Sequence, residues 1–422
     1  MKVLIYENKY DLAPIGGPKG YLYNLNLGLK ENNIKEVDFL ENKPNEKIEN
    51  LKNKLKRYPL FKKIIKKLSD KKWIKMVRRD YLFGIEENDG IDFNEYDIIH
   101  FHSTGDMYKV RGKLEKCKAK IVLTSHSPKP FSLEILDLLK EKNIKNIDEY
   151  YPIKKMDEYA FDRADYIFFP CKEAEEPYYN QWKEYDEIHK RNVDKYRYIL
   201  TGIKECNAKY SRSEIRKKYG IPQNAFLISY VGRHNQVKGY DLLKEIGRTI
   251  LEDMNEKTYF IIAGVEGPIY RLKNEKWIEV GWTREANSII ASSDLFVLPN
   301  KETYFDLVLL EVLSLGVPVL ASYTGGNKYF ETYENSGIFY FNNKEEAVNQ
   351  IKKLSHTDSK KLEEYGKLNK DIFLKDFNES VFAKNYIELV NKLWGKKYEK
   401  KEIYYNNNCI VHYIRHSINI YK

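Results

Sequence analysis

The chain has 422 residues, more than one hydrophobic core usually serves, so we predict two domains. Hydrophobic residues make up 42% of it and aromatic residues 14%, a composition that excludes a disordered protein. Its four cysteines (Cys117, Cys171, Cys206 and Cys409) are too far apart for a metal knuckle or a redox motif, and no apolar run is long enough to span a membrane. We therefore expect a cytoplasmic protein with free thiols, whose short N-terminal apolar run is not a signal peptide.

The formal net charge of +10 is concentrated in one segment. Thirteen basic residues and one acid lie between Lys52 and Arg79, a net charge of +12, which leaves −2 for the rest of the chain. Apolar residues recur among these lysines at helical spacing, a pattern typical of basic helices that lie on anionic lipid. A solvated helical face over the domain core fits the pattern equally well. Nucleic acid is not an expected partner, because no nucleic-acid-binding motif accompanies the charge.

The first half of the chain alternates predicted strands and helices. It opens with a strand (KVLIY), a glycine loop (APIGGPKG) and a helix with apolar residues at a period of 3.6. Further strands are predicted over 37–40, 96–102, 120–126, 165–170 and 196–200. This alternation favours a parallel sheet covered by helices on both faces.

A second series of strands follows a polar, turn-rich crossing (TGIKECNAKYSRSEIRKKYGIPQN). Its strands are predicted over 226–232, 258–264, 277–281, 294–299, 317–322 and 337–341. The layout predicts two doubly wound, Rossmann-like α/β domains, over 1–205 and 206–375, followed by a helical segment. Ligands of such sheets bind beyond the carboxyl ends of the strands, so a cleft between the domains is the expected site.

Two glycine loops are candidate phosphate sites. In YVGRHNQVKGYDLL, Gly232 is followed by Arg233 and Lys238 between a strand and a helix, where two cations and a helix N-terminus favour a diphosphate, although such residues are often only solvated. The first loop contains Gly16 and Gly17, whose backbone allows close approach of a ligand. The order GGPKG is not the Gly-x-Gly-x-x-Gly of dinucleotide sites; Asp38 or Glu41 could serve as a ribose-binding acid, so that function is weakened without being excluded.

Three histidines lie near predicted strand ends. His126 ends KIVLTSHSP, where its side chain would face the cleft, although a lone histidine there is more often structural. His100 and His102 alternate with apolar residues, and we expect at least one of them to be in the core.

The segment SSDLFVLPNKETYFDLVLLEVLSLGVPVLAS reads as strand, loop, helix and strand. The pattern predicts a helix from near Thr303 to Gly316, with Thr303 as N-cap and Asp306 reaching back in a capping box. Glu311 lies among leucines and valines of this helix, where an unpaired carboxylate is expensive to bury, so it needs a partner.

Together these stretches resemble the family 4 retaining glycosyltransferases of GT-B fold. The resemblance covers about residues 1–394 and is most specific over 226–330, where SYVGRHNQVKGYDLL, IIAGVEGP and LPNKETYFDLVLLEVLSLGVPVLASYTGG are similar to the family's motifs. It implies a GT-B enzyme with two Rossmann-like domains around a central cleft, in which the final helices (376–422) pack back on the first domain. It also implies a UDP- or GDP-linked sugar donor, a glycan or lipid-linked acceptor, and no metal or other cofactor.

The resemblance assigns a role to each candidate residue. Arg233 and Lys238 would hold the diphosphate, Glu311 would accept the ribose hydroxyls, and His126 would contact the donor sugar near the reacting carbon. Gly16, Gly17 and Gly232 would let backbone approach the phosphates, and the amides of Tyr304, Phe305 and Asp306 would face the sugar and phosphate. Because many such enzymes use lipid-linked acceptors, it also favours docking of residues 52–79 on the inner face of the cell membrane.

One position departs from the family pattern of Glu, seven residues, Glu. Counting back from Glu311 leads to Thr303, and Glu302 is one place too early. We predict that Thr303 takes the sugar-facing position. The alternative is a non-catalytic GT-B subunit that binds glycan or assists a partner transferase.

Overall fold

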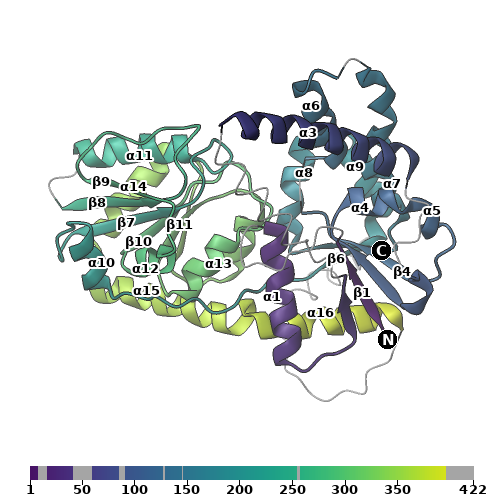
Figure 1. Cartoon of the computed structure of the whole chain (residues 1–422). Helices are drawn as coiled ribbons and strands as arrows, with labels where there is room; N and C mark the ends of the chain where they lie inside the picture. The colour runs from purple at the N-terminus through teal and green to yellow at the C-terminus, as the bar shows by residue number, and fades with distance from the viewer. Residues whose placement is uncertain are drawn as a thin grey trace, which may run out of the picture.

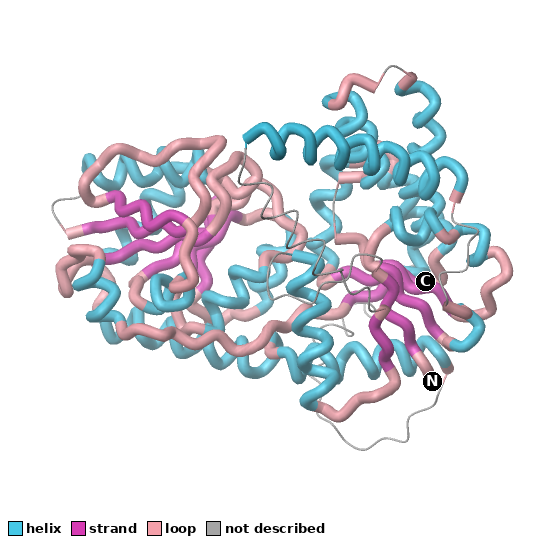
Figure 2. Tube along the Cα trace, in the orientation of Figure 1, coloured by secondary structure: helices cyan, strands magenta, loops and turns pink. Residues whose placement is uncertain are grey.

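The computed structural model describes residues 1–7, 17–40, 59–84, 91–126, 129–144, 146–253 and 257–395. Within these ranges the chain forms two six-stranded parallel sheets, each flanked by helices (Figures 1 and 2). The long helices at the end of the described chain run along both domains (Figure 1). The two-domain α/β fold predicted from the sequence is therefore confirmed.

The first sheet has the strand order β2-β1-β3-β4-β5-β6. Its strands are β1 (Val3–Tyr6), β2 (Val37–Phe39), β3 (Ile98–Phe101), β4 (Lys120–Leu123), β5 (Tyr166–Phe169) and β6 (Tyr196–Tyr198). Its helices are α1 (Gly17–Glu31), α3 (Pro59–Val77), α4 (Thr104–Lys109), α5 (Arg111–Leu114), α6 (Phe131–Glu141), α7 (Lys155–Arg163), α8 (Glu176–Gln181) and α9 (Tyr185–Asn192). Short 3₁₀ segments include η3 (Ile147–Lys154) and η4 (Lys172–Glu175).

The second sheet has the order β12-β11-β10-β7-β8-β9, that of a doubly wound nucleotide-binding domain. Its strands are β7 (Phe226–Val231), β8 (Thr258–Ala263), β9 (Trp277–Gly281), β10 (Leu295–Leu298), β11 (Val319–Ser322) and β12 (Ile338–Phe341). Its helices are α10 (Arg212–Lys218), α11 (Tyr240–Asp253), α12 (Ala286–Ala291), α13 (Leu307–Ser314), α14 (Lys344–Ser355) and α15 (Ser359–Ile372), with the 3₁₀ segment η6 (Gly325–Thr332). The order of the strands reverses between β7 and β10, which makes this edge the expected ligand site.

Both faces of each sheet are buried, which explains why every predicted strand is present. Ile228 and Tyr230 of β7 pack with α11 and α14, whereas Leu227 packs with α10 and α12 on the opposite face. In β1, Val3 and Ile5 pack with α1, and Leu4 packs in the cluster that includes α7. A strand buried on both sides reads as a continuous apolar run, and such runs mark the central strands, such as VLIY of β1, IIHF of β3 and LFVL of β10, whereas the edge strands β2 (VDF), β6 (YRY) and β9 (WIEVG) include polar residues and are only partly buried.

Helix α16 (Glu379–Trp394) lies against α1 of the first domain. Tyr21 and Phe382 meet edge to face, with ring centroids 5.0 Å apart. The helices approach so closely that a Cβ on Gly28 would lie 1.9 Å from the carbonyl oxygen of Glu379, so only glycine fits there. Residues 396–422, the rest of the predicted C-terminal segment, lie outside the described ranges.

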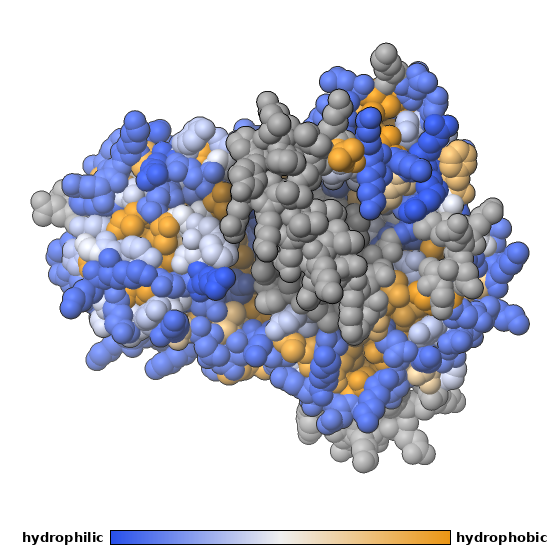
Figure 3. All heavy atoms as spheres, viewed as in Figure 1, coloured by the Kyte–Doolittle hydropathy of each residue, from blue (hydrophilic) through white to orange (hydrophobic). Residues whose placement is uncertain are grey.

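The basic segment is partly a core element. Val77 and Tyr81 are buried against α6 and η3, and Trp73 and Ile74 pack on the same cluster. Lysines on the outer side of α3 remain exposed, as do Leu68 and Phe83, which are 62% and 67% exposed. Figure 3 shows hydrophilic and hydrophobic side chains intermixed over this part of the first domain. The first part of the predicted segment, residues 52–58, lies outside the described ranges.

Candidate active site

The loops that follow β7 and β10 meet at the point where the strand order reverses. Lys238, after β7, forms an ion pair with Asp306, after β10, with 2.6 Å between Nζ and Oδ2. Asn300 donates its side-chain amide to the same oxygen at 2.5 Å. Burial alone would raise the pKa of Asp306, but the charge and hydrogen bond of Lys238 hold it below its usual value. Asp306 is therefore a buried anion that fixes the position of the Lys238 ammonium group.

Gly239 allows these two loops to touch. Its φ of +63° suits glycine. A Cβ at this position would lie 1.7 Å from the carbonyl oxygen of Pro299 at the end of β10. In the Lys-Gly motif, Lys238 thus supplies the cation, and Gly239 allows the close backbone approach that brings this cation to the loop after β10.

Arg233 is an exposed cation in the same loop as Lys238. Its carbonyl oxygen accepts a hydrogen bond from the Tyr230 hydroxyl group at 2.9 Å, which anchors the backbone of the loop. In the described ranges no carboxylate lies within ion-pair distance of its guanidinium group. Gly232, which precedes it, bonds to Ala263 at the end of β8. An anchored loop with an unpaired guanidinium group beside Lys238 is suited to an anion such as a diphosphate.

The helix that follows the β10 loop, α13, starts later than predicted. Helix α13 begins at Leu307, and Asp306 is its N-cap, accepting a hydrogen bond from the Val308 amide at 3.2 Å. The prediction that Thr303 caps the helix and that Asp306 reaches back is wrong. Thr303 is a buried loop residue whose carbonyl oxygen accepts from the Gly326 amide at 3.3 Å.

The physical reason is that aromatic contacts hold the loop away from helical geometry. The Tyr304 ring lies 5.6 Å from that of Phe169, and Phe305 stacks on Phe330 at 5.6 Å. Both side chains are drawn into apolar surroundings before the helix begins. Asp306, an equally good cap by residue type, therefore becomes the first residue that can start the helix.

Glu311 lies in α13, where burial, and then the charge of Asp306, raise its pKa from 4.5 to about 7. Among the described residues no hydrogen bond or ion pair reaches its carboxylate. The partner that the sequence requires is therefore not supplied by these residues. A carboxylate in this state is a receptor for hydroxyl groups of a ligand.

His126 follows β4 and faces the loop that precedes α13. Its ring centroid is 6.3 Å from that of Tyr304, and its Nε2 lies 3.0 Å from Nδ1 of His102. Burial lowers the pKa of His126 to about 3, so the ring is neutral. His100 bonds to the hydroxyl groups of Thr124 and Tyr386 and is a core residue. His102 orients His126, a role that its apolar neighbours in the sequence did not reveal.

The first glycine loop can be placed only in part. Gly16 lies outside the described ranges, and Gly17 is the first residue of α1. One turn later, a Cβ on Gly20 would lie 3.1 Å from the Leu307 side chain, so the start of α1 abuts the start of α13. This contact brings the start of α1 toward the loop that contains Tyr304.

Glu7 directly follows β1 and was not recognised from the sequence as a candidate site residue. Burial, and then the charge of Asp106, raise its pKa to about 7. In the first sheet the strand order reverses at β1, which lies between β2 and β3. Residues that follow a strand at such a point often contact ligands, and this position could have identified Glu7 from the sequence.

Residues 211–371 match the family model of glycosyl transferases, group 1. The match covers the loop of Arg233 and Lys238, the loop before α13, and Glu311. A chain described as a UDP-Gal:alpha-D-GlcNAc-diphosphoundecaprenol alpha-1,3-galactosyltransferase, from Escherichia coli, is 24% identical over 302 residues, 67% of this chain and 72% of that one. An uncharacterized 41.2 kDa protein in the cps region of Klebsiella pneumoniae is 25% identical over 290 residues, 62% of this chain and 75% of that one.

The fold is shared with solved structures of two-domain proteins, some of them crystallised with UDP. The crystal structure of HepE from Anabaena, in complex with UDP and glucose, superposes with a TM-score of 0.57 at 15% identity and covers 93% of this chain and all of HepE. The chain therefore has the GT-B fold, as expected, and its similarity to the group 1 transferases extends over residues 211–371.

The described ranges contain no cluster of three or more side chains placed to hold a metal ion. Nor does any described helix combine the length and apolarity needed to cross a membrane.

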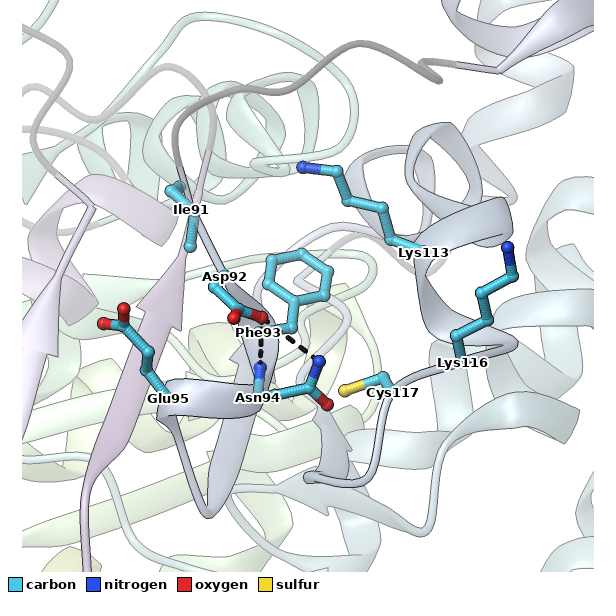
Figure 4. Close-up of a pocket in the computed structure, with 8 residues that line it drawn as sticks. All are labelled: Ile91, Asp92, Phe93, Asn94, Glu95, Lys113, Lys116 and Cys117. Carbon is cyan, nitrogen blue, oxygen red and sulfur yellow. Dashed lines mark hydrogen bonds between the residues drawn. The ribbon is translucent and has the colours of Figure 1, made fainter.

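A pocket of about 480 Å³ lies away from this site (Figure 4). Its lining comes from the turn before β3 and from the connection between α5 and β4, at the amino ends of the first-domain strands. Asp92 accepts hydrogen bonds from the backbone and side chain of Asn94 within it. Because ligands of such sheets bind at the opposite ends of the strands, we do not assign the site to this pocket.

Proposed function

We propose that the protein transfers a sugar from a nucleotide-sugar donor to a glycan or lipid-linked acceptor, with retention of configuration, in the synthesis of a cell-surface polysaccharide. The observation that carries this proposal is the Lys238–Asp306 ion pair at the reversal point of the second sheet, with Arg233 in the same loop as Lys238 and with Glu311 within reach of the charge of Asp306. The relatives support the substrate class, because one is described as acting on a diphosphoundecaprenol-linked sugar and another comes from a cps region.

The roles follow from charge and position. Arg233 and Lys238 neutralise the leaving diphosphate, and Glu311 accepts the ribose hydroxyls, which supplies its missing partner. His126 contacts the donor sugar from the first domain, and the loop from Thr303 to Asp306 faces the sugar and phosphate. A diphosphate oxygen accepts the proton of the acceptor hydroxyl while the new bond forms on the same face, so no protein nucleophile is needed.

A donor screen that measures release of each nucleoside diphosphate tests this function. Arg233→Ala should lower kcat/KM at least a hundredfold while the melting temperature stays within about 1 °C, because Arg233 is exposed and unpaired in the described ranges. Arg248→Ala, which removes an exposed arginine from α11, is the matched control. Near-normal turnover of Arg233→Ala or of Lys238→Ala would refute the assignment.

The alternative is a non-catalytic GT-B subunit that binds glycan or assists a partner transferase. The replacement of the family's first carboxylate by Thr303 is the observation that favours it. Titration calorimetry with nucleotide sugars separates the two functions, because a pure partner subunit binds none of them.

We also propose that the outer side of α3 docks on anionic lipid. Lys71, Lys72, Lys75 and Leu68 are exposed there, and Phe83 is exposed in the segment that follows α3. Sedimentation with anionic vesicles should recover the protein, and replacing the three lysines by glutamine should abolish this recovery. The matched control replaces three exposed lysines of α15 (Lys360, Lys361 and Lys367). Equal binding to neutral vesicles, or no binding, would contradict the proposal.

A further inference from the structure

One short segment of the first domain touches the second domain at three points. This segment runs from the end of η4 through α8, over residues 175–181. Its partners are the loop before α13 and the turn at the start of η6. All three contacts reach Tyr304, the residues just before it, or the turn that packs against its backbone. The segment therefore acts on one unit of the second domain, the loop before α13 together with the turn that supports it.

The first contact is made by Glu176. Its carboxylate accepts hydrogen bonds from the Gly325 amide at 3.2 Å and from the Thr324 hydroxyl group at 3.3 Å, and it pairs with Lys328. Every one of these donors belongs to the turn that begins η6. A first-domain carboxylate therefore fixes a second-domain turn.

This turn supports the backbone of Thr303 and Tyr304. A Cβ on Gly325 would lie 1.9 Å from the Thr303 carbonyl oxygen, and one on Gly326 would lie 2.2 Å from the Tyr304 carbonyl oxygen. The Gly326 amide also donates to the Thr303 carbonyl oxygen. With no side chains between them, a shift of the turn must move the loop.

The other two contacts reach the loop directly. Gln181 donates its side-chain amide to the carboxylate of Glu302, which precedes Thr303. The Tyr304 ring lies 6.1 Å from that of Tyr178, whose hydroxyl group donates to the Ser125 carbonyl oxygen. Glu302, the carboxylate nearest in sequence to Thr303, is thus hydrogen-bonded to the first domain.

We infer that Glu176 and Gln181 are positioning residues that hold the Thr303–Tyr304 backbone in the geometry needed to bind the donor sugar. This inference rests on the proposed function. Where the family pattern has a carboxylate, this chain has Thr303, and the position of its backbone depends on contacts from the opposite domain. The charges that hold the diphosphate, those of Arg233 and Lys238, lie in the loop after β7, and Lys238 is fixed by Asp306 within the second domain, so diphosphate binding depends less on these contacts. The two halves of the donor therefore respond differently to changes in α8.

A swap of partners tests the Gln181 contact. Gln181→Glu places two carboxylates against each other, and Glu302→Gln leaves two amides. The double variant Gln181→Glu/Glu302→Gln restores an amide–carboxylate pair with its direction reversed. We expect Gln181→Glu to lower kcat/KM for the nucleotide sugar at least tenfold, and the double variant to recover most of this loss.

The measurement that separates positioning from general stability is the Kd of the free nucleoside diphosphate. This Kd should stay within about twofold of the wild-type value in Gln181→Glu and in Glu176→Gln, whereas kcat/KM for the nucleotide sugar falls in both. Glu187→Gln, on an exposed carboxylate of α9, is the control and should change neither quantity.

Three results would overturn the inference: wild-type kcat/KM in Gln181→Glu, a parallel loss of nucleoside diphosphate binding, or a double variant as impaired as the single one. Failure of the proposed function looks different. In that case the wild-type protein releases no nucleoside diphosphate from any donor, and this inference falls with it.

Discussion

Glu311→Gln should change the pH dependence of stability, because it removes a carboxyl group that is costly to ionise. Burial and Asp306 raise the pKa of Glu311 from 4.5 to about 7 in the folded protein. The folded state then binds the proton more tightly than the unfolded state does. The wild-type protein is therefore stabilised by this group below pH 4.5 and loses that contribution as the pH rises through 7.

The size of this stability change follows from the pKa shift of Glu311. A difference of about 2.5 pKa units corresponds to about 3 kcal/mol of unfolding free energy. Relative to the wild type, Glu311→Gln should gain this amount between pH 4.5 and pH 8, because glutamine does not ionise. For a domain of this size the gain equals roughly 6–12 °C in melting temperature.

Thermal unfolding followed by tryptophan fluorescence at several pH values between 5 and 8 measures this effect, since Trp277 and Trp282 lie in the second domain. Glu363→Gln, on an exposed carboxylate of α15, should give the same difference at every pH. A difference between Glu311→Gln and the wild type that does not vary with pH would refute the reasoning. Under the proposed function, nucleoside diphosphate affinity should also rise as the pH increases through 7, and this rise should be absent in Glu311→Gln.

Two further substitutions probe the loops around this group. Asp306→Asn leaves one oxygen where Asp306 uses two, so either the Val308 amide or Lys238 and Asn300 lose their acceptor; stability should fall by about 1–3 kcal/mol, and the anion that fixes Lys238 is removed. Calorimetry should show tighter nucleoside diphosphate binding and kinetics a kcat at least tenfold lower; unchanged kcat would contradict the role of the pair. Gly325→Ala should cost about 2 kcal/mol more than Gly220→Ala in urea unfolding, because both have positive φ but only Gly325 lies against a carbonyl oxygen. Equal losses would show that the contact with Thr303 is unimportant.

The strands and the residues directly after them could be predicted from the sequence for one physical reason. Parallel strands buried on both faces give continuous apolar runs, and the residues that follow them lie at the edge where ligands bind. Arg233 after β7 and His126 after β4 were found in this way. Glu7 follows β1 by the same logic and could have been found too.

The start of α13 could not be predicted, because its signal is degenerate. Thr303 and Asp306 are both good N-caps, and the capping-box pattern, which opens at Thr303 and not at Asp306, favours the wrong residue. Contacts of Tyr304 with Phe169 and Tyr178, more than 100 residues away in the chain, decide between them. Local patterns carry no information about such contacts. The same holds for Glu176 and Gln181, which lie in a helix too short to show a hydrophobic period.

The loop before α13 is held by both domains. Lys238 and Asn300 hold Asp306 from within the second domain, and the Lys301 amide donates to the Val237 carbonyl oxygen at the start of the loop. Gln181 of the first domain holds Glu302. Thr303, Tyr304 and Phe305 therefore lie between a first-domain contact and a second-domain contact, so a change in the angle between the domains acts on these three residues. Under the proposed function they face the sugar, and the geometry of the sugar site then depends on domain closure more than the positions of Arg233 and Lys238 do.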